Sequence, residues 1–510
     1  MSTIYLDGQN LTPETLYNLG YSNHTLAIAD SAWSQIESSH NYLKSILESG
    51  DVAYGINTGF GYFANVTIEE DKLKTLQRNL IRSHCVGVGP SFTIPRTKMI
   101  LALRINVLCK GCSGTSPELI NKLVEAYNKG CFSFVPEQGT VGACGDLAPL
   151  AHLFLGLMGE GLMWDEDTQN YESAEKVLLK KNYEPVRDLF PKEGLSIING
   201  PQIITSLLTE GYIRGKILAE AADIIAALTI ECLRSLATPF DERIHMSRPH
   251  FGQITVAKRI RSLLLPKSEI AINTPFDKVQ DAYSIRCIPQ VHGVTWDTLN
   301  FVNTILTTEL NSATDNPLIF SETQACLSGG NFHGEYTAKM SDFLAIALHE
   351  LGSISEVRIS RLMRKEITNF EYFLVQNPGL NSGLMMVHCT AASLVSENKQ
   401  LCHPASVDSI PTSAGQEDHV SMGGWAARKL IKVVDNLQNI LAIELLSDLH
   451  ALVFLKPHKT TDALEKVIKL ARNVVDVRDT DYNISPDIKS LYELIGSGAL
   501  SEAVREYWEN

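Results

Sequence analysis

With 510 residues, the chain is long enough for one large domain or two to three ordinary ones, and its 58 acidic and 44 basic residues give a net charge of −14. This balance argues against nucleic acid or an anionic membrane as the main partner, and neither a signal peptide nor a membrane-spanning apolar run is evident in the sequence. Ten dispersed cysteines do not form a disulfide framework, so we expect reduced thiols in a cytoplasmic protein.

The helical pattern begins with Thr12-Pro13-Glu14, a typical helix start, and shorter helices are expected over 69–83, 96–110 and 117–128. Three longer stretches contain helix formers throughout, with no Pro and few Gly: 203–236, 335–365 and 424–455. At 1.5 Å rise per residue, a helix of ~30 residues is about 45 Å long, a length typical of helical bundles.

Strand-like alternation is scarce, so the sequence predicts a mostly α protein in which a bundle of long helices carries functional loops. The loops expected between the long helices are rich in Asn, Gly and Pro and cover 273–293, 311–334 and 403–423. We expect a single unit with an N-terminal part over 1–200, the bundle over 201–457 and a C-terminal helical segment over 458–510.

The loop at 139–152 contains the tripeptide Ala143-Cys144-Gly145. Small residues on both sides of a Cys or Ser allow the nitrogen of the third residue to approach the carbonyl carbon of the first, and Gly145 has no Cβ to obstruct this. Cyclisation and loss of the Cys144 side-chain sulfur would leave an exocyclic methylidene on a five-membered ring, which is an electrophile. The alternative interpretation is a loop that turns into a helix, with Asp146 as its N-cap and Pro149 in its first turn.

Other loops carry polar or aromatic residues of the kinds that bind and transform substrates, because loops positioned by rigid scaffolds are where chemistry tends to occur. The candidates are Tyr54, His84, Asn199, Gln280, Tyr283, Arg286, Phe332 and Glu417.

Metal and redox sites are less well supported. Cys109 and Cys112 form a Cys-x-x-Cys, but no second such pair accompanies them, and the pairs His245/His250 and His333/His349 lack ligand spacing. We therefore expect no metal.

The string Gly-Thr-Val-Gly-Ala-Cys-Gly-Asp-Leu-Ala-Pro-Leu-Ala-His resembles the motif of the aromatic amino acid ammonia-lyases, which make 4-methylidene-imidazol-5-one from Ala-Ser-Gly. The candidates from Tyr54 to Glu417 match the family pattern in order, so the resemblance spans essentially the whole chain. It implies the architecture shared with fumarases and aspartases, no external cofactor, and a homotetramer with shared active sites. Cys144 departs from the family serine, but ring closure uses the Gly145 nitrogen and the Ala143 carbonyl, so position 144 needs only a β-substituent that can leave.

The resemblance also implies a role for each candidate. Tyr54 or Glu417 takes the β-proton of the substrate, with Tyr54 preferred provided that its surroundings lower its pKa. Arg286 binds the substrate carboxylate, and His84 and Glu417 bind an imidazole. Four residues orient the amine or pack against the ring: Asn199, Gln280, Tyr283 and Phe332.

Glu417 favours the histidine-specific branch of the family, because the phenylalanine- and tyrosine-specific relatives carry an amide at its position. A carboxylate suits an imidazole, which offers an N–H, whereas a phenyl ring offers none. The expected reaction is elimination of ammonia from L-histidine to give trans-urocanate, the first step of histidine degradation. The alternatives are a phenylalanine or tyrosine lyase, an aminomutase, or a silent homologue in which Cys144 blocks ring formation.

Overall fold

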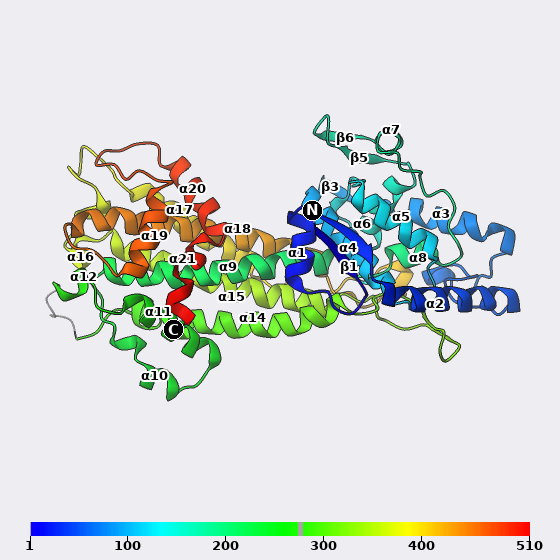
Figure 1. Ribbon diagram of the computed structural model, residues 1–510, viewed down its shortest axis with the longest axis horizontal. Coiled ribbons are helices and arrows are strands. Elements are labelled where there is room, and N and C mark those ends of the chain that lie inside the picture. The colour runs from blue at the N-terminus through cyan, green and yellow to red at the C-terminus, as the bar shows by residue number, and fades with distance from the viewer. Residues whose placement is uncertain (1, 274–278, 510) are drawn as a thin grey trace. The chain divides into compact units, whose positions relative to one another are not determined.

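The computed structural model describes residues 2–273 and 279–509, and it is mostly helical, as predicted (Figure 1). The chain forms two compact units, each assembled from three separate stretches. The first unit contains residues 1–210, 303–342 and 404–428, and the second contains 211–302, 343–403 and 429–510. The divisions expected from the sequence, at residues 200 and 457, stay a prediction.

The first unit consists mainly of helices that are shorter than those of the bundle and are joined by loops. The Thr12 hydroxyl accepts a hydrogen bond from the Thr15 amide, so α1 starts where the sequence predicts. The predicted helices over 69–83, 96–110 and 117–128 are confirmed as α3, α4 and α5. The helices of this unit are α1 (Pro13–Tyr21), α2 (Asp30–Ser49), α3 (Leu73–His84), α4 (Ile94–Cys109), α5 (Pro117–Asn128), α6 (Leu147–Leu157), α7 (Ala174–Lys180) and α8 (Glu193–Ile198).

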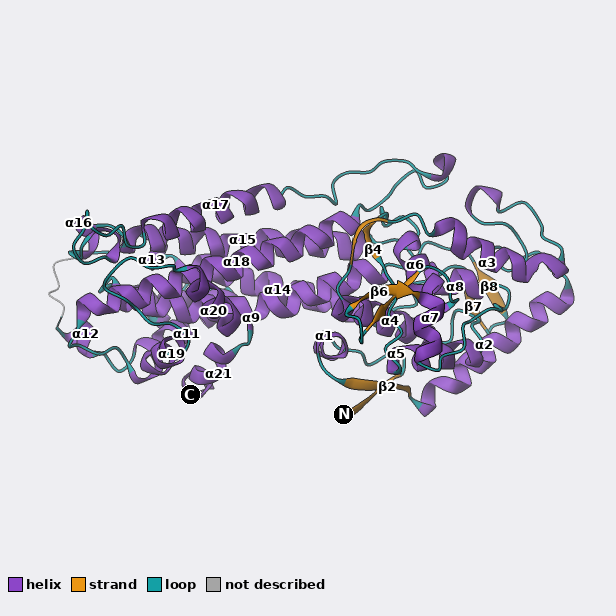
Figure 2. Ribbon diagram, turned by 90° about the horizontal axis from the view of Figure 1, so that it is seen from above, coloured by secondary structure: helices purple, strands orange, loops and turns teal. Residues whose placement is uncertain are grey.

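The strands of this unit form two-stranded pairs, which Figure 2 shows in orange. Three pairs are antiparallel, whereas β1 pairs with β2 in parallel, with Ser2 opposite His24 and Leu6 opposite Ile28. Pairs this short leave little periodicity to detect in a sequence. The strands are β1 (Ser2–Leu6), β2 (His24–Ile28), β3 (Val88–Ser91), β4 (Pro136–Gln138), β5 (Leu162–Asp165), β6 (Asn170–Ser173), β7 (Leu318–Phe320) and β8 (Ala325–Leu327).

The longest helices of the described chain are α9 (Gln202–Cys232), α14 (Ile288–Leu310), α15 (Glu335–Leu362) and α18 (Gly423–Ala451). The three that the sequence predicts are confirmed. The prediction of a loop over 273–293 is wrong in its last part, because α14 begins at Ile288. Residues 274–278 of the predicted loop lie outside the described residues. Pro289 and Gly293, near the start of α14, conceal it in the sequence.

In the second unit, the four long helices lie side by side and shorter helices surround them (Figures 1 and 2). The predicted C-terminal helical segment is confirmed as α19, α20 and α21. The shorter helices are α10 (Glu242–Met246), α11 (Phe251–Leu264), α12 (Glu269–Ile272), α13 (Tyr283–Arg286), α16 (Lys365–Thr368), α17 (Met385–Leu401), α19 (Asp462–Arg472), α20 (Ser485–Gly496) and α21 (Ala499–Glu509).

One stretch of the described chain, Gly423–Leu455, is long and apolar enough to cross a membrane by composition alone, with a mean hydropathy of 1.4. In the structure 83% of its most apolar window is buried within the protein. This burial is typical of the core helix of a bundle.

A buried polar network links the long helices of the second unit. The Arg358 guanidinium pairs with both oxygens of Glu444, and both side chains are fully buried. The Thr229 hydroxyl lies 2.9 Å from Glu444 Oε1 and 2.9 Å from Asp448 Oδ2. A hydroxyl has one proton and cannot donate to both carboxylates. Since the arginine pairs with Glu444, we infer that Asp448 is the protonated acid. Burial, together with the charge of Glu444, raises the pKa of Asp448 well above its usual value.

A variant in which Asp448 cannot ionise tests this inference. In the folded chain Asp448 keeps its proton, whereas in the unfolded chain it releases this proton near pH ~3.9. The contribution of Asp448 to the free energy of unfolding therefore falls as the pH rises from ~3.9 toward the pKa of Asp448 in the folded chain. Asp448→Asn lacks this dependence. We expect the melting temperature of Asp448→Asn, relative to the wild type, to increase between pH 5 and pH 9.

Glu444→Gln is the matched control, because it leaves the buried Arg358 charge without its carboxylate and should destabilise the fold by about 3–5 kcal/mol. A melting-temperature difference for Asp448→Asn that stays constant with pH would show that Asp448 is ionised in the folded chain.

Candidate active site

A cavity of about 760 Å³ opens in the first unit, where loops from six parts of the chain meet. It brings together residues that the sequence singles out and that lie hundreds of positions apart. The predicted residues that line it are Tyr54, His84, Ala143, Cys144, Asn199, Phe332 and Glu417.

The loop that carries Ala143-Cys144-Gly145 is held against the start of α9. Gly145 has a φ of +70° and forms a bridge with Gly200, and a Cβ on Gly145 would lie 2.1 Å from the Gly200 carbonyl carbon. Only glycine fits this position, because both the backbone conformation and the close approach exclude a side chain. The Thr140 hydroxyl accepts from the Gly142 amide and donates to the Gly145 carbonyl, which closes the loop.

Asp146 occupies the N-cap position of α6, as the alternative interpretation expects, but its side chain does not cap that helix. Its Oδ2 instead accepts from the backbone amides of Ile203 and Ile204, in the first turn of α9. The carboxyl is fully buried, and burial raises its pKa to about 7. Asp146 therefore joins the tripeptide loop to the first turn of a different helix.

Cys144 and Glu417 are 273 positions apart in sequence, and their side chains meet in the cavity. The Cys144 thiol donates to Glu417 Oε1 over 2.9 Å. Burial raises the pKa of the Cys144 thiol far above its usual value, and the hydrogen bond to Glu417 and the charge of this carboxylate raise it further. Cys144 is therefore a neutral thiol and not a thiolate nucleophile.

Glu417 is ionised in this environment. Burial raises the pKa of Glu417, but hydrogen bonds from Cys144, Thr412 and Ser413, together with the nearby His84, outweigh burial and leave the pKa below its usual value.

His84, at the end of α3, lines the cavity. Its Nδ1 lies 2.8 Å from the Leu80 carbonyl oxygen, an acceptor, so Nδ1 carries the proton and Nε2 of the neutral ring is an acceptor. Burial lowers the pKa of His84, more than the Leu80 carbonyl and Glu417 raise it. The cavity therefore offers two acceptors to a ligand, His84 Nε2 and the Glu417 carboxylate.

Tyr54 begins the loop 54–61, which contains three glycines, and its hydroxyl oxygen accepts from the Gly61 amide over 3.2 Å. Burial raises the pKa of Tyr54, and the charge of the Glu417 carboxylate raises it further against the lowering effect of the Gly61 amide. The expectation that the surroundings lower this pKa is wrong in this structure. The phenol is protonated at neutral pH.

Asn199 is buried in the cavity wall. Its Nδ2 donates to the Asn316 carbonyl, whereas its Oδ1 has no hydrogen-bond partner among the described residues. A buried acceptor without a partner is rare in folded proteins, and Asn199 is one of the residues that line the cavity. Asn199 Oδ1 is therefore available to an N–H donor of a ligand.

Arg104 was not among the residues predicted from the sequence, and its side chain binds the backbone carbonyl of Asn199. Its Nη1 donates to the carbonyl oxygens of Asn199 and Thr314, each over 3.0 Å, and its guanidinium also binds the Ser196 carbonyl. The available signal was a single charge inside the apolar run of 99–108, in a helix that is buried over this whole length. A buried ion pair between Lys192 and Asp315, 2.7 Å apart, supports the same region.

Three predicted residues lie elsewhere. Gln280, Tyr283 and Arg286 belong to the second unit, and this cavity, whose described lining comes from the first unit, does not include them. The Arg286 guanidinium stacks 4.6 Å from the centre of the Tyr283 ring and donates to the Gln280 side chain. The Tyr283 side chain is 70% exposed. Gly145 is also absent from the described lining, because it faces Gly200.

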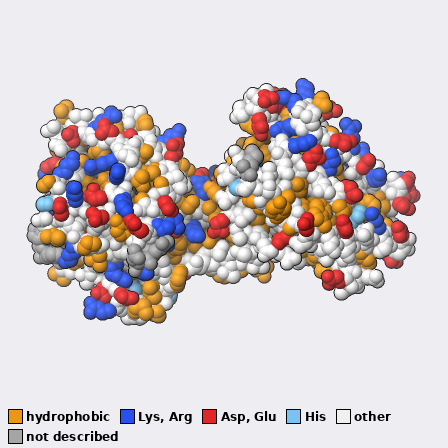
Figure 3. Space-filling model, in the orientation of Figure 1, with side chains coloured by type: hydrophobic (Ala, Val, Ile, Leu, Met, Phe, Trp, Pro, Cys, Tyr) orange, Lys and Arg blue, Asp and Glu red, His pale blue; other side chains and the backbone are white. Residues whose placement is uncertain are grey.

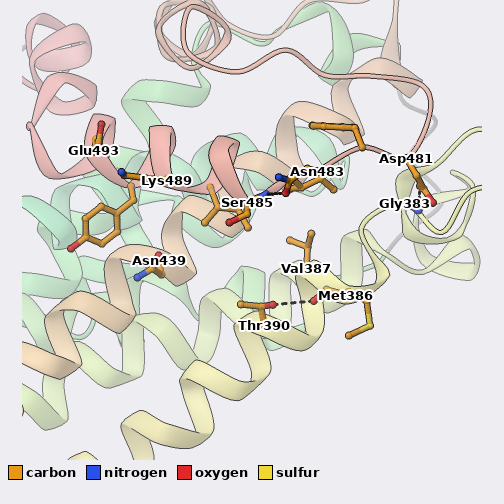
Figure 4. Close-up of a pocket in the computed structure, with 14 residues that line it drawn as sticks. Gly383, Met386, Val387, Thr390, Asn439, Asp481, Asn483, Ser485, Lys489 and Glu493 are labelled. Atoms are coloured by element: carbon orange, nitrogen blue, oxygen red, sulfur yellow. Dashed lines mark hydrogen bonds between the residues drawn. The ribbon is translucent and has the colours of Figure 1, made fainter.

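A second cavity, of about 780 Å³, lies in the second unit between α17, α20 and the segment before α20 (Figure 4). Asp481 at its end accepts from the backbone amides of Ser382 and Gly383, just before α17, and the Thr390 hydroxyl donates to the Met386 carbonyl within α17. The described lining contains none of the predicted site residues.

The Cys-x-x-Cys motif also lies apart from the site. Burial raises the pKa of Cys109 to about 12 and raises that of Cys112, so both are neutral thiols at physiological pH. Neither has the lowered pKa of a redox-active cysteine.

Comparisons with known proteins identify the family of the chain. The aromatic amino acid lyase family matches residues 11–473. Histidine ammonia-lyase of Mus musculus is 52% identical over 510 residues, which cover 99% of this chain and 77% of the mouse protein. The crystal structure of histidine ammonia-lyase from Trypanosoma cruzi is 48% identical with a TM-score of 0.93, covering 99% of this chain and 96% of that chain. Tyrosine aminomutase from Streptomyces globisporus, 32% identical, also has a TM-score of 0.93, covering 99% and 98%. The chain belongs to the aromatic amino acid lyase family.

Proposed function

We propose that this protein is a histidine ammonia-lyase, which eliminates ammonia from L-histidine to give trans-urocanate. The observation that carries the proposal is the pair of acceptors in the cavity, Glu417 and His84 Nε2. A protonated imidazole ring has two N–H groups and can donate one to each, whereas a phenyl or phenol ring has none. The relatives named histidine ammonia-lyase, up to 52% identical over nearly the whole chain, support the same substrate.

We further propose that Ala143, Cys144 and Gly145 form a 4-methylidene-imidazol-5-one. The Gly145 nitrogen would attack the Ala143 carbonyl carbon with loss of water, and Cys144 would then lose its α-proton and its sulfur as hydrogen sulfide. The structure fits this group in two respects: Gly145 fits only as glycine, and Asn199, which lines the same cavity, has a buried Oδ1 without a hydrogen-bond partner. The ring would supply an electrophile that makes the substrate amine a better leaving group.

The chain's own side chains would bind the substrate and move its β-proton. Glu417 and His84 hold the imidazole, and Asn199 Oδ1 accepts from the amine. The base is Tyr54 or Glu417, and the two differ in their state at neutral pH: the raised pKa of Tyr54 keeps the phenol protonated, and the lowered pKa of Glu417 keeps the carboxylate ionised. Phe332 would pack beside the ring, and Gln280, Tyr283 and Arg286 would bind the amine, the ring and the substrate carboxylate.

The test is an assay of the purified chain with L-histidine, L-phenylalanine and L-tyrosine, recording ammonia and the absorbance of the conjugated product. We expect ammonia and urocanate from L-histidine alone. A β-amino acid product from tyrosine would indicate an aminomutase, and cinnamate or coumarate would indicate a phenylalanine or tyrosine lyase. No turnover, together with an intact mass equal to the encoded mass, would indicate a silent homologue.

We also propose a cytoplasmic homotetramer in which neighbouring copies complete each active site. Large apolar side chains are exposed on the parts of α14 and α15 in the second unit, as is typical of helices that associate with another subunit. They are Val294 (54% exposed), Phe301 (51%), Phe343 (45%), Ile346 (41%) and Val357 (44%). Acidic and basic side chains are interspersed on the face of each unit in Figure 3, which is compatible with a partner of the same kind.

Sedimentation checks this proposal. We expect a species of about four times the 56.3 kDa of the chain, and we expect substitution of Arg286 by Met to lower turnover without dissociating it. A fully active monomer would contradict the shared site.

A further inference from the structure

The two carboxylate oxygens of Glu417 have different partners. Oε1 accepts from the Cys144 thiol over 2.9 Å, and Oε2 accepts from the Thr412 hydroxyl over 2.5 Å. Thr412 therefore binds the oxygen that does not face the tripeptide.

The backbone holds Thr412 opposite Glu417. The Thr412 amide donates to the Glu417 carbonyl over 2.9 Å, and the Glu417 amide donates to the Thr412 carbonyl over 3.3 Å, so the two residues form an antiparallel bridge. The turn between them contains Ser413 and Ala414, with φ values of +52° and +54°, in a region that side chains other than glycine rarely adopt. The branched side chain of Thr412 has few χ1 options, so its hydroxyl is held in place.

Ring formation would change the surroundings of the two oxygens unequally. If Cys144 loses its sulfur as hydrogen sulfide, the donor at Oε1 disappears, whereas the donor at Oε2 remains. Oε1 then becomes the acceptor that is free for a substrate N–H.

We infer that Thr412 is a positioning residue, which binds Glu417 Oε2 and so directs Oε1 toward the imidazole of the substrate. This inference depends on the proposed function, because it assigns the freed oxygen to an imidazole N–H. Thr412 does not touch the substrate; it acts through Glu417.

Other groups around Glu417 also contribute to its charge state, so the test must isolate the hydroxyl of Thr412. Ser413, on the same turn, contributes a further hydrogen bond that lowers the pKa of Glu417. The titratable groups that line the cavity with Glu417 are Tyr54, Tyr62, His84, Cys144, His333, Asp418 and His419.

Substitutions at Thr412 separate the hydroxyl from the shape of the side chain. Thr412→Val keeps the branched shape and loses the donor, and Thr412→Ser keeps the donor and loses the methyl. We expect Thr412→Val to lower kcat/KM for L-histidine about tenfold, the factor of roughly one hydrogen bond to a charged group, and Thr412→Ser to stay near the wild type. The acid limb of the pH profile of kcat/KM should move to higher pH in Thr412→Val, because Glu417 without the donor has a higher pKa and must be ionised to bind.

The control is Thr255→Val, which removes a hydroxyl that donates to the Phe251 carbonyl within the half-buried helix α11 of the second unit. It should change neither kcat/KM nor the pH profile. The intact mass of each variant shows whether the ring has formed, so a loss of activity through failed maturation is recognised.

The outcomes are distinct. A wild-type chain that does not turn over L-histidine contradicts the proposed function. An active wild type with an unshifted acid limb in Thr412→Val contradicts the positioning role. If Thr412→Val does not fold, Thr412→Ala is measured in its place, and an acid limb like that of the wild type overturns the inference. Failure of both to fold, with Thr412→Ser folded, would make the hydroxyl a requirement of the fold, and the inference would be wrong.

Discussion

Cys144→Ala should lose nearly all turnover of L-histidine and keep its encoded mass, whereas Cys144→Ser should stay active. Ring closure joins the Gly145 nitrogen to the Ala143 carbonyl carbon and does not involve the side chain of residue 144. Elimination then requires a β-substituent that can leave; sulfide and water leave, but the hydrogen of alanine does not. Both the wild type and Cys144→Ser should therefore have the same mature mass, lighter than the wild-type encoded chain by one water and one hydrogen sulfide.

The measurement is intact-protein mass beside a histidine assay, with thermal unfolding of each variant as the control for folding. The structure supports the comparison, because a serine hydroxyl at residue 144 can donate to Glu417 as the thiol does. If Cys144→Ser is folded but inactive, or a free thiol is titrated at Cys144 in the active wild type, Cys144 acts as a thiol and the proposed ring is wrong.

Glu417→Gln should lower kcat/KM for L-histidine about ten- to hundredfold, since a hydrogen bond to a charged group is worth roughly 1.5–3 kcal/mol, and further if Glu417 also moves the proton. The amide has one oxygen where the carboxylate has two. If the amide oxygen accepts from the Thr412 hydroxyl, the NH₂ group faces the cavity, where two donors, this NH₂ and the imidazole N–H, face each other. If the amide oxygen instead faces the cavity, the NH₂ group must donate to Thr412, which would then have to accept.

Steady-state kinetics with L-histidine and L-phenylalanine measure this effect. The intact mass is the control and should equal that of the mature wild type, because Glu417 provides no atom of the ring. The ratio of activity on phenylalanine to activity on histidine should rise. An unchanged histidine rate in Glu417→Gln would remove Glu417 from substrate recognition.

Much of the local structure could be predicted from the sequence. Helix propensity and the absence of Pro over 203–236 and 424–455 depend on neighbouring residues alone, and α9 and α18 lie where they were expected. The same local rules failed at Ile288, where α14 begins beside residues that usually favour a loop. Helix propensity is a weak predictor at Ile288, because packing in the bundle determines whether this segment is helical.

The residues of the site also differ in whether the sequence predicted them. A motif match identified Cys144, but a lone arginine in an apolar helix gave no indication that Arg104 binds the loop of Asn199. The pKa of Tyr54 could not be predicted either, because burial of the phenol depends on distant segments of the chain.

The sequence by itself determined three of the four long helices, the tripeptide at 143–145 and the set of polar loop residues, because each depends on short-range chemistry. Only the tertiary structure decided that Cys144 and Glu417, 273 positions apart, lie within 2.9 Å, and that His84 presents Nε2 as an acceptor. These features arise where loops from distant parts of one chain fold against each other. Hydrogen bonds and burial then set the protonation of each group, and neither can be read from the order of residues.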